Sequence, residues 1–144
     1  MERLRDFLKT LLPSLWGKKS ILSPKAELGL QGEKVARRYL QRLGMRFLAK
    51  NVRTRRGEID LVFRDRDCLV FVEVKTRSSE DLFRPAAAVT YRKRRALRHA
   101  AFDYLQMIGS PPIKVRFDIV EVVIRNGHIT EIRHLPNAIV LSYP

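Results

Sequence analysis

The stretch CLVFVEVK, from Cys68 to Lys75, constrains the fold more than any other part of the chain. Successive side chains of a strand point to opposite faces, so Phe71, Glu73 and Lys75 share one face and the valines between them share the other. A strand that begins apolar on both faces is typical of an inner strand in a covered sheet. A carboxylate and an ammonium at the end of such a face therefore need a physical reason.

The segments around this strand alternate between helical and extended patterns. Apolar residues at helical spacing predict a helix that starts at Lys25 and ends near Gly44, and a second one that is capped by Thr90. Alternating segments and turn residues predict four more strands: Arg46–Val52, Ile59–Phe63, Val115–Ile124 and Ile129–Arg133, the last after the hairpin turn Asn126-Gly127. The predicted order is α-β-β-β-α-β plus one strand, which is an α/β fold.

The charge of the chain restricts its partners. The 144 residues carry 29 Lys and Arg against 15 Asp and Glu, a formal net charge of +14, which favours a polyanion. Nucleic acid is the leading candidate, and a ribosomal or an anionic membrane surface is the alternative. The lone Cys68 excludes an internal disulfide and a Cys-based zinc site, so we expect it to pack.

Residues 1–24 differ from the rest and are predicted to form an amphipathic appendage to a domain that spans residues 25–144. Charged residues interrupt its apolar stretch, which argues against a secretory signal, and no run is long enough to span a membrane. We therefore expect a cytoplasmic protein. The appendage is interpreted as a loosely held helix, and docking on a protein partner, on a second copy to give a homodimer, or on a membrane surface stays open.

The turn between the second and third strands determines which acids lie beside Glu73. If that turn has two central residues, Asp60 lies on the same face as Glu73 and Lys75. Glu58 lies two residues before Asp60. A three-residue loop would reverse the face.

On the first helix, Glu33 borders the apolar stripe and can lean toward the sheet. Together with Asp60, Glu73 and Lys75, it leaves about −2 of charge in a partly buried pocket, where an uncompensated charge costs several kcal/mol. A divalent cation balances that charge, and carboxylates with room for water and phosphate suit Mg²⁺ or Mn²⁺ rather than zinc. The alternative is that Glu73 and Lys75 are solvated strand ends that pair with neighbours.

These residues resemble a known group of proteins. Asp60 followed by Glu73-Val74-Lys75, in an α-β-β-β-α-β setting, is similar to the PD-(D/E)xK nuclease superfamily, which includes restriction enzymes and archaeal Holliday junction resolvases. The resemblance is more specific to the bacterial YraN-like family, and it is carried by four blocks: GEKVARRYL (32–40), NVRTRRGEIDLV (51–62), FVEVKTR (71–77) and RFDIVEV (116–122). It covers roughly residue 25 to the C-terminus.

The resemblance implies a restriction-endonuclease-like αβββαβ core, with a mixed central sheet flanked by helices, and it implies catalytic roles. Asp60 and Glu73 would be metal ligands, Lys75 would position the attacking water, Glu33 would be a ligand through water, and Glu58 would be an auxiliary acid. Two departures from the superfamily pattern are Ile59, in place of a nominal proline, and Arg84, where a glycine is expected in the loop from residue 78 to 87.

Two basic stretches flank these acids, from Arg37 to Arg56 and from Arg84 to Arg98, and neither contains an acid. Lys93 lies four residues before Leu97 on the second helix and so extends its inward stripe, which makes it a candidate phosphate contact near the metal. The candidate nucleic-acid-binding residues are Lys93, Arg92, Arg95, Arg53, Arg55, Arg56 and Arg77. The alternative is that these are ordinary solvated faces.

We therefore predict an enzyme, a Mg²⁺- or Mn²⁺-dependent endonuclease that hydrolyses phosphodiester bonds in DNA, with branched or junction DNA among its candidate substrates. The first alternative is a nucleic-acid-binding module that keeps the nuclease fold without turnover. The second is an interaction protein that is recruited through residues 1–24.

Overall fold

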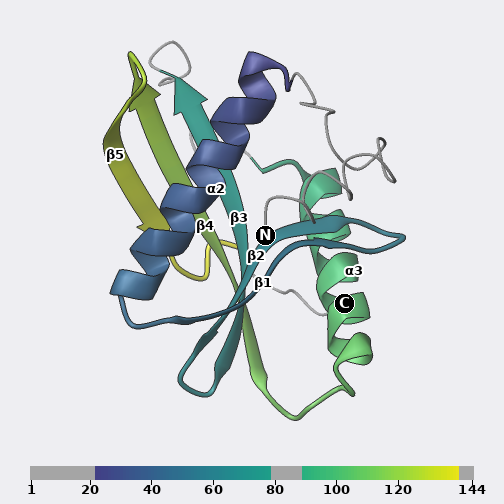
Figure 1. The fold of residues 1–144 in the computed structure, drawn as a ribbon. Coiled ribbons are helices and arrows are strands. Elements are labelled where there is room, and N and C mark those ends of the chain that lie inside the picture. The colour runs from purple at the N-terminus through teal and green to yellow at the C-terminus, as the bar shows by residue number, and fades with distance from the viewer. Residues whose placement is uncertain (1–21, 79–88, 140–144) are drawn as a thin grey trace, which may run out of the picture.

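The computed structural model describes residues 22–78 and 89–139. They form helices α2 (Pro24–Arg42) and α3 (Tyr91–Met107) and strands β1 (Arg46–Arg53), β2 (Glu58–Asp65), β3 (Cys68–Ser78), β4 (Lys114–Arg125) and β5 (His128–Leu135) (Figure 1). The strands make one sheet in the order β1-β2-β3-β4-β5. Strands β3 and β4 are parallel and the other neighbours are antiparallel. The predicted α/β fold, with a mixed sheet flanked by helices, is confirmed.

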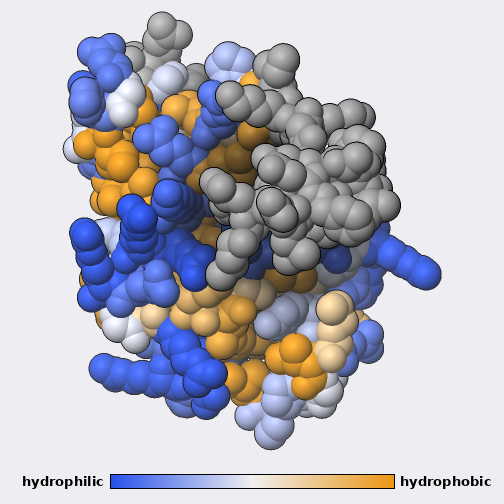
Figure 2. Space-filling model, viewed as in Figure 1, coloured by the Kyte–Doolittle hydropathy of each residue, from blue (hydrophilic) through white to orange (hydrophobic). Residues whose placement is uncertain are grey.

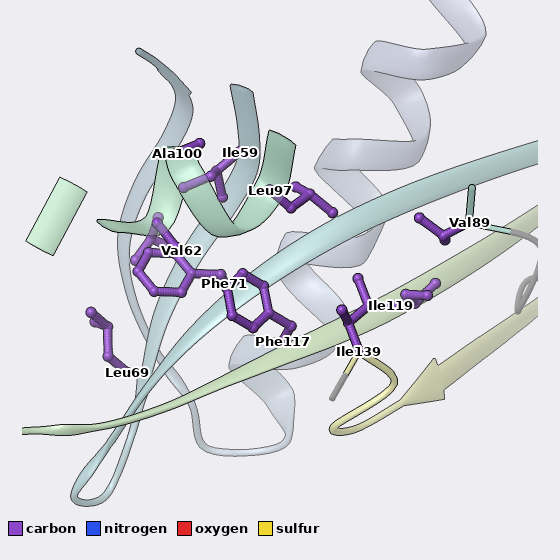
Figure 3. Packing of buried hydrophobic residues seen from close by; sticks show 11 residues of the cluster. Ile59, Val62, Leu69, Phe71, Val89, Leu97, Ala100, Phe117, Ile119 and Ile139 are labelled. Carbon is purple, nitrogen blue, oxygen red and sulfur yellow. The ribbon is translucent and has the colours of Figure 1, made fainter. Parts of the chain in front are cut away.

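The two faces of the sheet carry separate apolar clusters, because β3 is buried on both sides as predicted. On one face Phe71 stacks on Phe117, with ring centroids 5.4 Å apart, and packs against Leu97 of α3 (Figure 3). On the other face Val72 packs in the cluster that holds Leu40 of α2. Burial of this kind contributes roughly 1.5–3 kcal/mol for each large apolar side chain, so the two helices are held by the sheet.

The turn between β2 and β3 has the geometry on which the predicted site depended. Asp65 pairs with Cys68, so Arg66 and Asp67 are the two central residues. Arg66 adopts a positive φ of 55°, which a tight hairpin turn requires. The two-residue turn is therefore confirmed, and the register that it sets puts Asp60 opposite Glu73.

Helix ends follow the sequence signals, with two differences. The Ser23 hydroxyl accepts a hydrogen bond from the Ala26 N–H, and the Thr90 hydroxyl accepts one from the Lys93 N–H. Leu43 and Ile108, which the helical stripes placed inside, are the C-caps of α2 and α3 and are 54% and 45% exposed. A C-cap has left the helical path, so its side chain no longer follows the buried stripe.

A buried polar cluster ties β4 to β5 on the face that α2 covers. Asp118 is fully buried and accepts hydrogen bonds from Arg116 and from the Asn137 N–H, and its carboxylate lies 2.8 Å from His134 Nε2. Burial acts against the ionised form, but these hydrogen bonds outweigh it and hold the pKa of Asp118 below its usual range. The cluster is satisfied internally and so has a structural role.

Two sequence predictions concern residues that the structure does not describe. Residues 1–21 of the appendage and residues 79–87 of the loop after β3 lie outside the described residues. Within residues 22–78 and 89–139, no helix is both long enough and apolar enough to cross a membrane.

Helix α2 crosses β3 at Gly32, which stands next to Glu33. A Cβ atom at Gly32 would lie 1.8 Å from Thr76 Oγ1 and 3.0 Å from Thr76 Cβ, which is far inside van der Waals contact. Only glycine allows this approach, so the absence of a side chain at position 32 fixes the distance between α2 and the end of β3. Gly29, one turn earlier, has nothing within 4 Å of an added Cβ.

We expect Gly32→Ala and Gly29→Ala to change stability in opposite directions. Gly32→Ala should lower the free energy of unfolding by about 1–3 kcal/mol, because the methyl group overpacks against Thr76. Gly29→Ala makes the same chemical change in the same helix and should raise it by up to about 1 kcal/mol through helix propensity. Urea denaturation of both variants measures the difference, and equal effects would show that α2 does not approach β3 this closely.

Candidate active site

The four residues that the sequence assigned to catalysis line one cavity. A pocket of about 270 Å³ lies between the first turns of α2 and the second half of β3, and Glu33, Asp60, Glu73 and Lys75 are all on its wall. Glu33 comes from α2, Asp60 from β2, and Glu73 with Lys75 from β3. The three acids and the lysine therefore share one cavity, in which the ion pair of Lys75 is with Glu73. We call this cavity the carboxylate pocket.

Asp60 occupies the point where the β2–β3 ladder ends. The paired register of these strands runs from the turn to Leu61 opposite Val72 and stops there. Beyond it, Asp60 Oδ2 accepts a hydrogen bond of 2.7 Å from the Val74 N–H. The side chain thus satisfies a backbone group that a continuing strand would have satisfied, and this bond fixes the carboxylate beside β3.

Glu73 is the most constrained acid in the pocket. Its side chain is only 4% exposed, and its Oε1 lies 3.0 Å from Lys75 Nζ and 3.3 Å from Lys93 Nζ. Its Oε2 is buried and has no hydrogen-bond partner among the described residues. An unsatisfied buried acceptor costs about 1–3 kcal/mol, and more when it is charged, so the protein leaves this oxygen as an acceptor without a donor of its own.

The crowding of acids shifts the titration of two of them. Burial raises the pKa of Asp60 to about 7, and the Glu73 carboxylate raises it too, against the Val74 hydrogen bond, which lowers it. The pKa of Glu33 is raised by burial first, then by Glu58 and Glu73, while Lys50 lowers it. Glu58 is therefore close enough to act on Glu33, although it is not among the residues that line the pocket and it pairs with Arg53 at 3.6 Å.

Two lysines change the predicted charge balance. Lys93 reaches Glu73 from α3, as its place on the inward stripe predicted, and Lys25 lines the pocket from the start of α2. The three acids carry −3 and the three lysines, Lys75, Lys93 and Lys25, carry +3, so the expected excess of −2 becomes zero. Charge balance alone therefore no longer requires a bound cation. Sequence reasoning missed Lys25, although Lys25, Gly29 and Glu33 recur every fourth residue and so share one helix face.

Six of the seven predicted nucleic-acid-binding residues fall into two groups in the structure, and the seventh, Arg77, lies on β3. Arg92, Lys93 and Arg95 lie in the first turns of α3, where Arg95 Nε is 3.4 Å from His99. Arg53, Arg55 and Arg56 line a different groove, beside the second half of α3. Two arginines are engaged internally, because Arg56 is bonded to Asp103, and Arg77 Nε donates to buried Glu121 at 2.8 Å.

The donor set fits a hard divalent ion that shares its coordination with water and substrate. Among the described residues, no group of three or more His, Cys, Asp or Glu side chains is arranged so that it could hold a metal ion, so Asp60, Glu73 and Glu33 are not assembled as three direct ligands. Mg²⁺ is usually bound by one or two carboxylates together with waters and phosphate oxygens, and not by a protein cage. Asp60 and the partnerless oxygen of Glu73 supply two such carboxylates, so the residues present fit Mg²⁺ or Mn²⁺.

This combination defines the class of protein. A core of order αβββαβ, with an acid on β2 and an ExK triplet on the central strand, is that of a restriction-endonuclease-like protein. The sequence profile described as uncharacterised protein family UPF0102 matches residues 32–122. The chain belongs to this family, which is the YraN-like family of the restriction-endonuclease-like superfamily.

Relatives in the same family are similar over most of their length. A UPF0102 protein of Rhodococcus jostii (strain RHA1) is 43% identical over 111 residues, which cover 77% of this chain and 94% of that protein. A UPF0102 protein of Geobacter sulfurreducens is 41% identical over 116 residues, covering 81% and 91%. The names of both state the family and no reaction, so the reaction must be argued from the site.

The raised pKa of Asp60 predicts a specific pH dependence of stability. Folded protein holds the Asp60 proton up to about pH 7, whereas the unfolded chain releases it near the ordinary value of 3.8. The contribution of Asp60 to the free energy of unfolding therefore falls as the pH rises from about 4 to about 7. Asp60→Asn keeps an acceptor for the Val74 N–H and removes the ionisation, so the variant should gain stability relative to wild type across this window.

Urea denaturation at pH 5, 6, 7 and 8 tests this expectation. Asp67→Asn is the control, because Asp67 lies in the exposed β2–β3 turn and its pKa is lowered by Lys114. Its stability difference from wild type should stay flat over the same range. A flat difference for Asp60→Asn as well would show that the Asp60 carboxyl group is ionised normally.

Proposed function

We propose that the protein is a metal-dependent nuclease that hydrolyses phosphodiester bonds in DNA. The observation that carries this proposal is the carboxylate pocket, where Asp60, Glu73 and Lys75 meet and where one buried oxygen of Glu73 has no partner. The net charge of +14 supports a polyanionic substrate. Membership of the restriction-endonuclease-like superfamily supports phosphodiester hydrolysis by analogy with other proteins of the same fold.

Asp60 and Glu73 would hold a Mg²⁺ or Mn²⁺ ion, and Glu33, on the wall of the same pocket, would bind it through water. A bound ion of this kind supplies polarisation of the phosphoryl oxygen and a lowered pKa for the attacking water. Lys75, whose ammonium lies 3.0 Å from Glu73, would orient that water and stabilise charge on the phosphate. Lys93 reaches the same carboxylate from α3 and would contact a phosphate oxygen. No covalent intermediate with the protein is needed.

The paired state of Glu73 favours one alternative function. Lys75 and Lys93 both lie within 3.3 Å of the same Glu73 oxygen, so the described arrangement already compensates much of its charge. A module that binds nucleic acid without cutting it would keep this internal pairing and would bind no divalent ion. Metal binding therefore separates the two functions.

Substitution of Glu73 should separate cleavage from binding. Glu73→Gln preserves the size of the side chain but removes the charged ligand. Loss of a residue that only hydrogen-bonds to a metal ligand typically costs roughly 10- to 100-fold in activity, so loss of the ligand itself should lower Mg²⁺-dependent cleavage by more than that. DNA binding should persist or strengthen, because a negative charge near the phosphate is removed. Labelled branched, duplex and single-stranded substrates with Mg²⁺ or Mn²⁺ give the cleavage rates, and fluorescence anisotropy gives the affinity.

Substitution of Lys75 should give a different pattern. Lys75→Met should also abolish cleavage, but it should retain divalent-ion binding in calorimetry, because Asp60 and Glu73 remain. Lys114→Met is the matched control, since Lys114 is exposed at the opposite end of the sheet and pairs only with the exposed Asp67 among the described residues. If wild type binds no divalent ion even with DNA present, and cuts no substrate, the nuclease proposal fails and the binding module stands.

A further inference from the structure

A second groove adjoins the carboxylate pocket on the side of α2 and β1. It has a volume of about 340 Å³ and is lined by Leu30, Glu33, Lys34, Arg37, Lys50 and Asn51. Glu33 belongs to the walls of both cavities, so the groove and the pocket meet at this residue. Hydrophilic side chains gather over α2 on this side of the molecule (Figure 2).

The strand pairing joins the groove to Asp60 as well. Lys50 pairs with Leu61 and Val52 pairs with Ile59, so Asn51 lies opposite Asp60 across the β1–β2 ladder. Asn51 adopts a left-handed conformation with a φ of 50°, which asparagine tolerates better than most residues. The end of the groove is therefore one strand away from the carboxylate that would hold the metal.

The cations of the groove are positioned in advance. The guanidinium of Arg37 lies 3.6 Å from the centroid of the Phe47 ring, and Phe47 packs edge-on against buried Phe63 at 5.5 Å. Stacking of this kind holds a guanidinium in place and leaves its edge able to donate to phosphate. Lys34 and Lys50 are exposed on the two sides of the groove. Three cations thus face one acid, Glu33, in a cavity that continues into the pocket.

We propose that this groove is a second phosphate site, which holds the backbone of the same nucleic-acid strand on the α2 side of the phosphate in the carboxylate pocket. The inference rests on the proposed function and extends it to the path of the substrate. A strand held by Lys34, Arg37 and Lys50 on one side and by Lys93 on the other passes through the pocket. The substrate class is therefore a phosphodiester chain that is engaged at an internal position, and cleavage is endonucleolytic.

The ordinary role of such residues would be to form a solvated helix face, and three observations argue against that role here. The cations line a concave surface, the guanidinium of Arg37 is fixed by an aromatic ring, and the cavity shares Glu33 with the pocket. A solvated face requires none of these features.

The test is a salt titration of DNA binding by the full chain, with a chelator present so that nothing is cut. Each neutralised phosphate of duplex DNA contributes about −0.9 to the slope of log affinity against log salt. The double variant Lys34→Gln/Lys50→Gln should weaken binding and flatten the slope by about 1.8 for two lost phosphate contacts. Arg37 is left intact, because its packing on Phe47 makes its replacement a structural change.

The matched control is Arg64→Gln/Lys114→Gln, which removes the same charge from exposed positions at the far end of the sheet. Its slope should equal that of wild type. If both double variants flatten the slope equally, or if neither does, the groove is not a phosphate site. DNA binding by wild type would in that case still support nucleic acid as the partner. If wild type binds no branched, duplex or single-stranded DNA, the proposed function fails and the groove fails with it.

Discussion

The parallel pairing of β3 with β4 is the interaction on which the rest of the structure depends. It is continuous from Cys68 opposite Lys114 to Ser78 opposite Ile124. A parallel pair cannot be joined by a hairpin, so the chain must cross over one face of the sheet, and α3 lies in that crossover. The same helix brings Lys93 to Glu73, while the antiparallel turn before β3 brings Asp60. Glu73 on β3 therefore meets Lys93 from the crossover helix and Asp60 from β2, because β4 runs parallel to β3 and β2 runs antiparallel to it.

The central position of β3 also explains why the pocket is costly and still tolerated. Glu73 is nearly as buried as the apolar residues before it, and one of its oxygens has no partner among the described residues. Such a group destabilises the folded state, so other interactions must stabilise the fold enough to offset its cost. Here the apolar clusters on the two faces and the close contact of Gly32 with Thr76 hold the strand and the helix in place. The carboxylates therefore need not contribute to folding.

The sequence predicted the fold well because its signals were local. Alternation fixed the two faces of β3, Thr90 marked the start of α3, and the two-residue turn determined that Asp60 faces Glu73. The partners of individual arginines could not be predicted in the same way. Arg77 was expected to face nucleic acid, yet it bonds to Glu121 on the neighbouring strand, a contact that depends on the parallel register. Similarly, Arg56 meets Asp103 only because the β1–β2 turn lies against α3. Charge patterns identify basic stretches, but tertiary packing decides which of their members are already occupied.

The same packing divides the acids of a strongly basic chain into two kinds. Among the described carboxyl groups with a shifted pKa, those with a lowered value each have a basic partner: Asp67 with Lys114, Asp103 with Arg56, Asp118 with Arg116 and His134, and Glu131 with Arg133. The carboxyl groups with a raised value, Asp60 and Glu33, both line the carboxylate pocket. With a net charge of +14, cations are abundant, so acids that remain crowded against one another are the exception. These two groups share the wall of the carboxylate pocket with Glu73, whose buried oxygen has no partner among the described residues, so the raised pKa values and the unsatisfied acceptor lie at the same place.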